Sequence, residues 1–172
     1  MTYGKAVGRL MAAAPQLRDY MRTPSYCVMA TAIGCDVLRA FGIAARPVSA
    51  HLDFRASLDG EILTSTRQGV VLNPVPSPWD GHLLVSTDHD YLDLCCGQFT
   101  RPARGIVTTP TMRYGDGRHP LVQVALVRGF MWMEARPEDL SYQDSPDWSD
   151  VRKRQPLVKA VVRAIRRGPR HQ

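Results

Sequence analysis

The sequence predicts an α+β domain in which an antiparallel sheet packs against a helix near the amino terminus. Three observations lead there: an early helical segment with an apolar face, a series of closely spaced strand candidates, and a final helical segment. With 172 residues, 44% of them hydrophobic, the chain can bury one ordinary core. We therefore expect a single domain over 1–172, with an amino-terminal helix in 1–22, a core in 23–135, and a linker and basic helix in 136–172.

Two helices are predicted before the sheet. The first covers residues 5–22 and ends at the Thr-Pro pair that follows, because proline cannot continue a helix. The second begins near Ser25, a capping residue, and ends at Gly42. Its buried face is predicted from apolar residues at helical spacing: Ala30, Ile33, Gly34, Val37, Leu38 and Phe41. Cys27 lies on the same face, in the first turn.

After Gly42 the sequence period changes from that of a helix to that of a strand. Residues 46–54 alternate apolar and polar side chains, which predicts a half-buried strand. Further strands are expected at residues 60–66, 70–73, 82–86, 91–95, 121–127 and 130–135. Turn-rich segments at 73–81 and 112–120 separate them.

The net charge of +6 is concentrated at the carboxyl terminus. Residues 151–172 hold eight Lys or Arg and no acidic residue, which leaves 14 basic against 16 acidic groups elsewhere. Within 155–168, apolar residues recur at helical spacing: Leu157, Val158, Val161, Val162 and Ile165. This pattern predicts a helix with one packed and one solvated face, and we favour it over a weak contact with nucleic acid or an anionic membrane.

The cysteines and the hydropathy indicate a reduced, intracellular protein. None of the four cysteines lies in the CxxC spacing typical of zinc sites, and no metal site is expected. No apolar run approaches the ~20 residues that a membrane span needs, and the apolar stretch in residues 1–16 is too short for a signal peptide. We therefore expect a cytoplasmic protein without a membrane span.

A thiol in the first turn of a helix is placed well for nucleophilic chemistry. The amino-terminal N–H groups and the helix dipole favour thiolate over thiol, and the same N–H groups can receive an oxyanion. Such a nucleophile also needs a base, which must come from the neighbouring sheet.

The segment 81–99 offers a base and a carboxylate. If 82–86 and 89–93 pair through a two-residue loop, His82 and Asp93 lie directly opposite each other. A four-residue loop, 87–90, makes them diagonal neighbours on one face, whereas a three-residue loop places them on opposite faces. Two of these three registers put a carboxylate beside the imidazole, where it would fix the tautomer.

The run C-x7-C-D-V-L-R-A-F-G-I-A-A-R-P-V that starts at Cys27, followed by a Gly-His pair opening one strand and an aspartate in the next, resembles the transglutaminase-like branch of the papain-like cysteine enzymes. The hairpin is also similar to that of arylamine N-acetyltransferases. The resemblance covers residues 23–100 and implies a papain-like fold with Cys27 as nucleophile, His82 as base and Asp93 as orienting acid. Tyr26 and Leu83 stand where the family often has a tryptophan and an aromatic residue.

The resemblance implies acyl transfer from an amide or ester carbonyl through a thioester acyl-enzyme. With water as the acceptor the protein is a protease or deamidase; with an amine it is a transglutaminase or acyltransferase. We expect a protein, a peptide or a small acyl donor as substrate, and no cofactor unless the donor is a coenzyme A thioester. The alternative is a non-catalytic binding module of the same fold, whose basic helix contacts a protein or nucleic acid.

Three further residues are candidates for substrate contact. They are Tyr26 beside the cysteine, Trp79 shortly before His82, and Gln98, whose amide can polarise a carbonyl. The other cysteines are expected to be packing residues: Cys35, Cys95 and Cys96. His51 is the competing imidazole, and its position on the polar face of a strand predicts that it is exposed.

Overall fold

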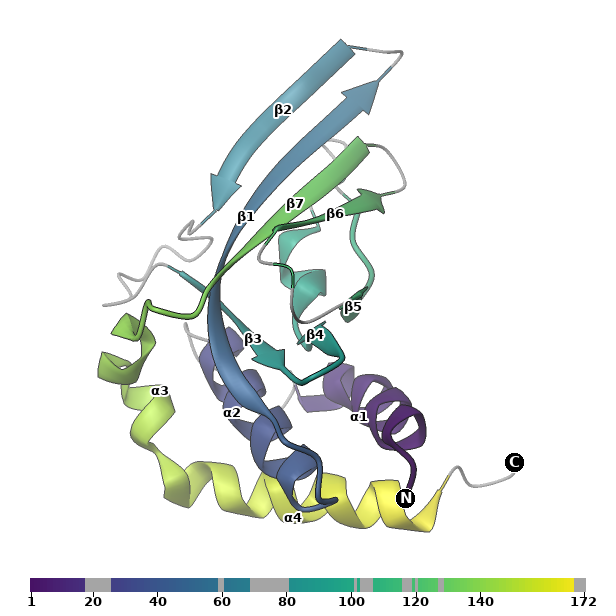
Figure 1. Cartoon of the computed structure of the whole chain (residues 1–172), viewed down its shortest axis with the longest axis vertical. Coiled ribbons are helices and arrows are strands. Elements are labelled where there is room, and N and C mark those ends of the chain that lie inside the picture. Colours follow the sequence, from purple (N-terminus) through teal and green to yellow (C-terminus); the bar gives the residue numbers. More distant parts are fainter. Residues whose placement is uncertain are drawn as a thin grey trace.

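The computed structural model describes residues 1–17, 26–58, 61–68, 81–100, 102, 107–115, 119, 121–126 and 129–168. The helices are α1 (Tyr3–Leu17), α2 (Tyr26–Arg39), α3 (Pro146–Ser149) and α4 (Val151–Arg167), and two 3₁₀ turns are η1 (Cys96–Phe99) and η3 (Ser141–Asp144). The strands are β1 (Arg46–Leu58), β2 (Glu61–Gln68), β3 (His82–Ser86), β4 (Asp90–Asp93), β5 (Met112–Gly115), β6 (Leu121–Leu126) and β7 (Gly129–Arg136). The predicted α+β class is confirmed, and α1, α2 and α4 gather at one end of the sheet (Figure 1).

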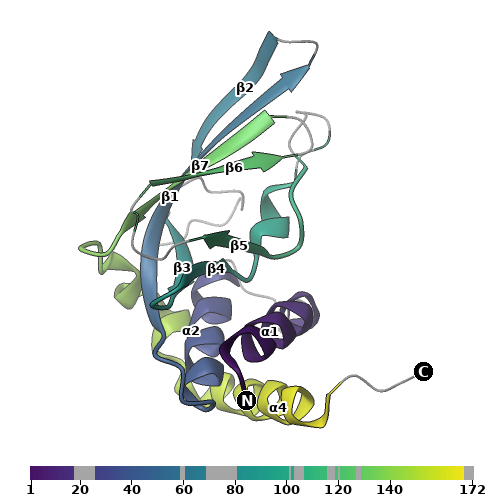
Figure 2. The ribbon, with the colours of Figure 1, turned by 45° about the vertical axis from the view of Figure 1, so that its right-hand side comes forward.

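The strand pairs of the described residues are all antiparallel. Their order is β5-β4-β3-β1-β7-β6, with β2 paired to β1. The long strand β1 connects the two halves: its first residues pair with β3, and its later part pairs with β7 and β2. The outer strands β5 and β6 come close to each other, so the sheet is nearly a barrel (Figure 2).

The helix α2 lies against β3 because its middle carries no side chain at Gly34. A Cβ there would be 2.5 Å from Leu94 Cδ1 and 2.9 Å from Val85 Cγ2, closer than real contacts allow. Around this approach lies a core of apolar side chains from α1, α2, α4 and the sheet, including Leu10, Ile33, Leu38, Leu92 and Ile165. The predicted buried stripe of the cysteine helix is therefore confirmed.

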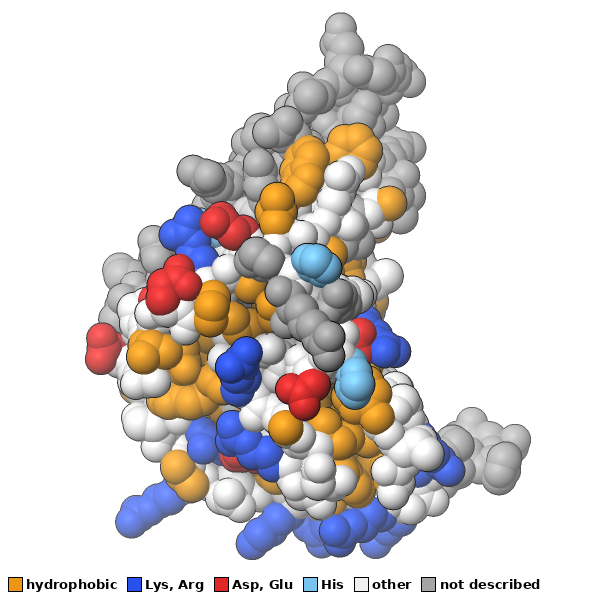
Figure 3. All heavy atoms as spheres, viewed as in Figure 1, with side chains coloured by type: hydrophobic (Ala, Val, Ile, Leu, Met, Phe, Trp, Pro, Cys, Tyr) orange, Lys and Arg blue, Asp and Glu red, His pale blue; other side chains and the backbone are white. Residues whose placement is uncertain are grey.

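The basic carboxyl-terminal helix is packed on one face, as the sequence predicts. Its buried residues are Val158, Val161, Val162 and Ile165. It begins before the predicted start at 155, because Asp150 caps it by accepting the Lys153 N–H at 2.9 Å. Arg154 Nε donates to Asp36 Oδ2 at 2.9 Å and so joins α4 to α2. Lys and Arg side chains line the lower edge of the molecule, where α4 runs (Figure 3).

One local prediction is wrong. The segment 112–120 was expected to be a turn, but Met112–Gly115 forms β5 and pairs with β4. Pairing with a neighbouring strand overrides the glycine-rich local composition here, and it buries Tyr114. The predicted strand 70–73 and the end of the first predicted helix, 18–22, lie outside the described residues. None of the helices in the described ranges is long and apolar enough to cross a membrane.

Candidate active site

The first turn of α2 brings Cys27 to the start of β3. The helix begins at Tyr26, so Cys27 is its second residue, where backbone N–H groups have no partner within the helix. One turn later, the buried Thr31 Oγ1 donates to the Leu83 carbonyl at 2.8 Å. This bond fixes the amino-terminal turn of α2 beside the strand residue that follows His82.

The hairpin of β3 and β4 places His82 and Asp93 on one face. Its pairs are Val85 with Leu92 and Ser86 with Tyr91, which leaves a four-residue loop. This is the diagonal register among the predicted alternatives. His82 Nε2 lies 2.8 Å from Asp93 Oδ2, and the two residues are 2% and 0% exposed. A buried imidazole and a buried carboxylate are therefore joined directly.

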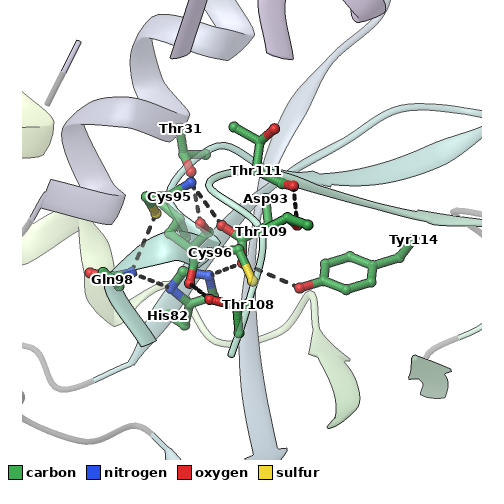
Figure 4. A network of polar contacts seen from close by, with 11 residues as sticks. Thr31, His82, Asp93, Cys95, Cys96, Gln98, Thr108, Thr109, Thr111 and Tyr114 are labelled. Atoms are coloured by element: carbon green, nitrogen blue, oxygen red, sulfur yellow. Dashed lines mark hydrogen bonds and ion pairs between the residues drawn. The ribbon is translucent and has the colours of Figure 1, made fainter. Parts of the chain in front are cut away.

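Asp93 is held in place by two further donors. Its Oδ1 accepts the backbone N–H of Cys95 at 2.9 Å, and its Oδ2 accepts the hydroxyl of Tyr114 at 3.2 Å (Figure 4). Burial, followed by the charge of Asp93, raises the pKa of Tyr114 well above its usual value, so the phenol stays a donor. Sequence reasoning missed Tyr114, because it lies on the strand that was predicted to be a turn.

The environment of His82 favours its protonated form. Burial by itself would lower the pKa of His82, but the charge of Asp93, its hydrogen bond and a hydrogen bond with Cys27 raise that pKa to about 10. Because Nε2 faces Asp93, Nδ1 is the nitrogen left for other partners. Phe99 contacts the same ring edge-on, with centroids 4.8 Å apart at 79°, and limits its rotation.

Gln98 also reaches the imidazole. Its Nε2 lies 3.4 Å from His82 Nδ1 and 3.4 Å from Cys95 Sγ (Figure 4). The short turn η1 that carries it is fixed from behind: the Gly97 N–H donates to the Pro110 carbonyl at 3.0 Å. A Cβ on Gly97 would lie 3.0 Å from Pro110 Cα, so the two segments touch. Of the three candidates for substrate contact, Gln98 is thus placed beside the His82–Asp93 pair.

The four cysteines have different surroundings. Cys27 is 7% exposed, whereas Cys35, Cys95 and Cys96 are 1%, 2% and 0% exposed. Burial raises the pKa of Cys35 to about 12. Burial, followed by the charge of Asp93, also raises the pKa of Cys95 and Cys96 well above the usual value. These three thiols are buried, in agreement with their predicted packing role.

Cys95 lies nearer to the imidazole than the sequence analysis anticipated. His82, Asp93 and Cys95 each offer one ligand atom, and these atoms lie within 4.8 Å of one another. The hairpin register explains this placement. In that register Leu84 lies opposite Asp93, and two residues further along His82 lies opposite Cys95. Cys27 and Cys95 pack in one cluster with Val28, Leu83, Tyr142 and, in part, Trp148.

The remaining sequence candidates take no described part in this cluster. The side chain of Tyr26 and the whole of Trp79 lie outside the described residues. His51 is half-buried rather than exposed, so that expectation is wrong. On β1 it lies opposite Glu134 of the neighbouring strand β7, and its charge helps to lower the pKa of Asp139.

Comparison with known proteins adds a likeness of fold alone. No family model matches the chain, and no curated protein does. The chain is similar to a solved structure described as "The crystal structure of genomics APC5867", with a TM-score of 0.58 and 14% identity. The match covers 100% of this chain and 83% of the other. The α+β arrangement therefore occurs in another protein of distant sequence.

Proposed function

We propose that the protein is a cysteine-dependent acyl-transfer enzyme of the papain-like, transglutaminase-like kind. One observation carries the proposal: the buried imidazole of His82 hydrogen-bonds to Asp93 through Nε2, and Cys27 lies close enough to the same ring to help raise its pKa. A nucleophile, a base and an orienting acid in this order form the arrangement that activates a side-chain nucleophile. An antiparallel sheet packed against a helix whose second residue is the cysteine supports the papain-like assignment.

In the proposed reaction His82 accepts the Cys27 proton at Nδ1, and the thiolate attacks the carbonyl carbon of the substrate. The carbonyl oxygen takes the electron pair and becomes an oxyanion, which the Cys27 backbone N–H can receive. His82 then returns the proton to the leaving amine or alcohol, and a thioester remains on Cys27. Water or an amine, deprotonated by His82, cleaves this thioester and releases the thiolate.

The surroundings of Asp93 serve this cycle by keeping one tautomer of the ring. With Nε2–H donating to Asp93, Nδ1 is the nitrogen that takes and returns the proton, and the Gln98 amide lies 3.4 Å from it. The Cys95 N–H and the Tyr114 hydroxyl occupy other acceptor positions of the carboxylate, so it cannot swing away. The acid therefore orients the ring and stabilises the imidazolium that forms during each turnover.

The proposal is tested by trapping the acyl-enzyme. The full chain is incubated with activated esters and glutamine-containing peptides, and the intact mass is recorded before and after hydroxylamine, which cleaves thioesters. A hydroxylamine-sensitive adduct should appear on Cys27, should be absent in Cys27→Ala, and should persist in the control Cys35→Ala.

Alkylation gives a second readout that needs no substrate. Iodoacetamide at mildly acidic pH should label Cys27 faster than the three other cysteines, and Asp93→Asn should slow that labelling. A labelling rate indifferent to Asp93, or an adduct on another cysteine, would contradict the assignment. A folded protein with no adduct from any donor would favour the non-catalytic binding module instead.

A further inference from the structure

The active-site cluster contains one thiol that the proposed reaction does not use. Cys95 is 2% exposed, accepts a hydrogen bond from the Gln98 amide at 3.4 Å, and packs in one cluster with Cys27. His82, Asp93 and Cys95 offer ligand atoms within 4.8 Å of one another. Two sulfurs and an imidazole in one buried place are the donors that soft divalent cations prefer.

The His82–Asp93 pair is arranged as in a metal-bound histidine. Ligating histidines commonly donate their second ring N–H to a carboxylate, which fixes the tautomer and leaves the other nitrogen for the metal. Here Nε2 faces Asp93 at 2.8 Å, Nδ1 faces the Gln98 amide that also contacts Cys95 Sγ, and Cys27 packs in the same cluster as Cys95. Asp93 then lies outside the coordination sphere, and the first ligands are His82 Nδ1, Cys95 Sγ and Cys27 Sγ.

The position of Gln98 shows where a cation would sit. A single nitrogen, Gln98 Nε2, lies 3.4 Å from both His82 Nδ1 and Cys95 Sγ, so the two acceptors converge on one point. An amide N–H is a weak occupant of a place shared by a nitrogen and a sulfur lone pair. Gln98 is half-buried, unlike the residues behind it, and its displacement would give a cation access from that side.

We propose that Cys27, His82 and Cys95 bind Zn²⁺, which shuts off the active site by occupying both the nucleophile and the base. Zinc binds thiolates at about 2.3 Å and imidazole at about 2.0 Å in a tetrahedron. His82 Nδ1 and Cys95 Sγ each lie 3.4 Å from Gln98 Nε2, so each must move about 1 Å closer to a cation at that point. Water or the Gln98 carbonyl oxygen completes the tetrahedron. The inhibitory consequence rests on the proposed acyl-transfer function, whereas the metal site itself does not.

Binding is tested on the full chain with Co²⁺, whose thiolate complexes absorb in the near ultraviolet. The wild type should show this band with one equivalent of Co²⁺, and Zn²⁺ should abolish it. Cys95→Ser, which keeps the size and polarity of the side chain, and Cys27→Ala should each lose the band, and Asp93→Asn should weaken binding about 10- to 100-fold. The band should persist in Cys35→Ala. Its absence from the wild type, or its survival in Cys95→Ser, would overturn the proposal.

The blocking of the nucleophile is tested by labelling Cys27 with iodoacetamide, followed by peptide mapping. At Zn²⁺ about ten times above its Kd, labelling should slow about tenfold in the wild type, because only the metal-free fraction reacts. The same Zn²⁺ concentration should leave the labelling rate of Cys95→Ser unchanged, and equal slowing in both proteins would contradict a role for Cys95. A cobalt band in a protein that forms no acyl adduct would support the metal site while removing the proposed function.

Discussion

Asp90 and Asp93 are two buried acids at the two ends of the same short strand, β4, with 3% and 0% of their surfaces exposed. Their partners differ in kind. Asp90 accepts from Arg113 Nε at 2.7 Å and from the Tyr3 hydroxyl at 2.5 Å, so a permanent cation faces it. Asp93 faces an imidazole, whose charge depends on a proton.

This difference separates a structural acid from the acid of the proposed reaction. Through Tyr3, Asp90 ties the first helix to the sheet, and its Arg113 partner has a side chain that is 49% exposed. The charge of Asp93 stabilises the protonated form of the His82 ring, whose pKa an interaction with Cys27 also raises. Burial of a carboxylate alone therefore does not mark a catalytic acid, and the role proposed for Asp93 rests on the kind of partner that it has.

The largest expected effect is on the reaction rate. Asp93→Asn keeps the shape of the side chain but removes the charge that holds the His82 tautomer, so we expect the acyl-transfer rate to fall about 10⁴-fold. The rate is measured as kcat on an ester donor. Asp90→Asn is the matched control on the same strand and should stay within a few-fold of the wild type. Equal losses in both variants would show that the two acids are not functionally distinct.

The second effect is on stability. Asp90→Asn removes an ion pair that is half accessible to solvent, so the free energy of unfolding should fall by about 1–2 kcal/mol. Denaturant unfolding of the wild type and the variant provides this value. An unchanged midpoint would mean that the contact between Asp90 and Arg113 contributes nothing to the stability of the fold.

The third effect is on the acid limb of the stability profile. Burial by itself would raise the pKa of Asp90, but the hydrogen bonds from Arg113 and Tyr3 outweigh it and lower that pKa. A lowered folded-state pKa stabilises the fold above the unfolded-state value, about 3.9, and this contribution disappears as the pH falls through the folded-state value. Unfolding free energies measured between about pH 2 and pH 6 should therefore decline less steeply in Asp90→Asn.

The smallest effects should come from two tyrosines that each donate to one of the acids. Tyr114→Phe removes a donor to Asp93, and a loss of about 1 kcal/mol of positioning should slow acyl transfer about fivefold. Tyr3→Phe removes a donor to Asp90 and should lower the free energy of unfolding by about 1 kcal/mol at an unchanged rate. The comparison fails if Tyr3→Phe slows the reaction and Tyr114→Phe does not.

The sequence predicts much of this arrangement because its strongest signals are local. Capping and helical spacing put Cys27 in a first turn, and the alternation of strand residues leaves His82 and Asp93 on one face in two of the three possible registers. The loop itself decides between those two: the Thr87 hydroxyl accepts the N–H of Asp90 at 3.0 Å, and the Thr87 N–H donates to the Asp90 carbonyl at 2.9 Å. A threonine that closes its own turn in this way favours the longer loop.

Other parts of the site depend on pairing between distant segments. Tyr114 reaches Asp93 only because residues 112–115 add a strand to β4, and nothing in their composition marks a strand. Cys95 reaches His82 through the continued register of the hairpin, beyond the last hydrogen-bonded pair. Such contacts follow from tertiary structure, so periodicity along the chain does not predict them.

The absence of a side chain at Gly34 determines how closely α2 packs on the sheet, and so where the Cys27 sulfur lies. Gly34 lies seven residues after Cys27, about 10 Å along the helix, and it marks where α2 rests on Leu94 and Val85. A methyl group at Gly34 would push α2 away from Leu94 and Val85. Because the helix is stiff, this would also displace its amino-terminal end, which carries the Cys27 thiol. Since a displacement of about 1 Å at reacting atoms can cost about 100-fold in rate, the close packing at Gly34 would influence the proposed reaction from a position seven residues away from the thiol.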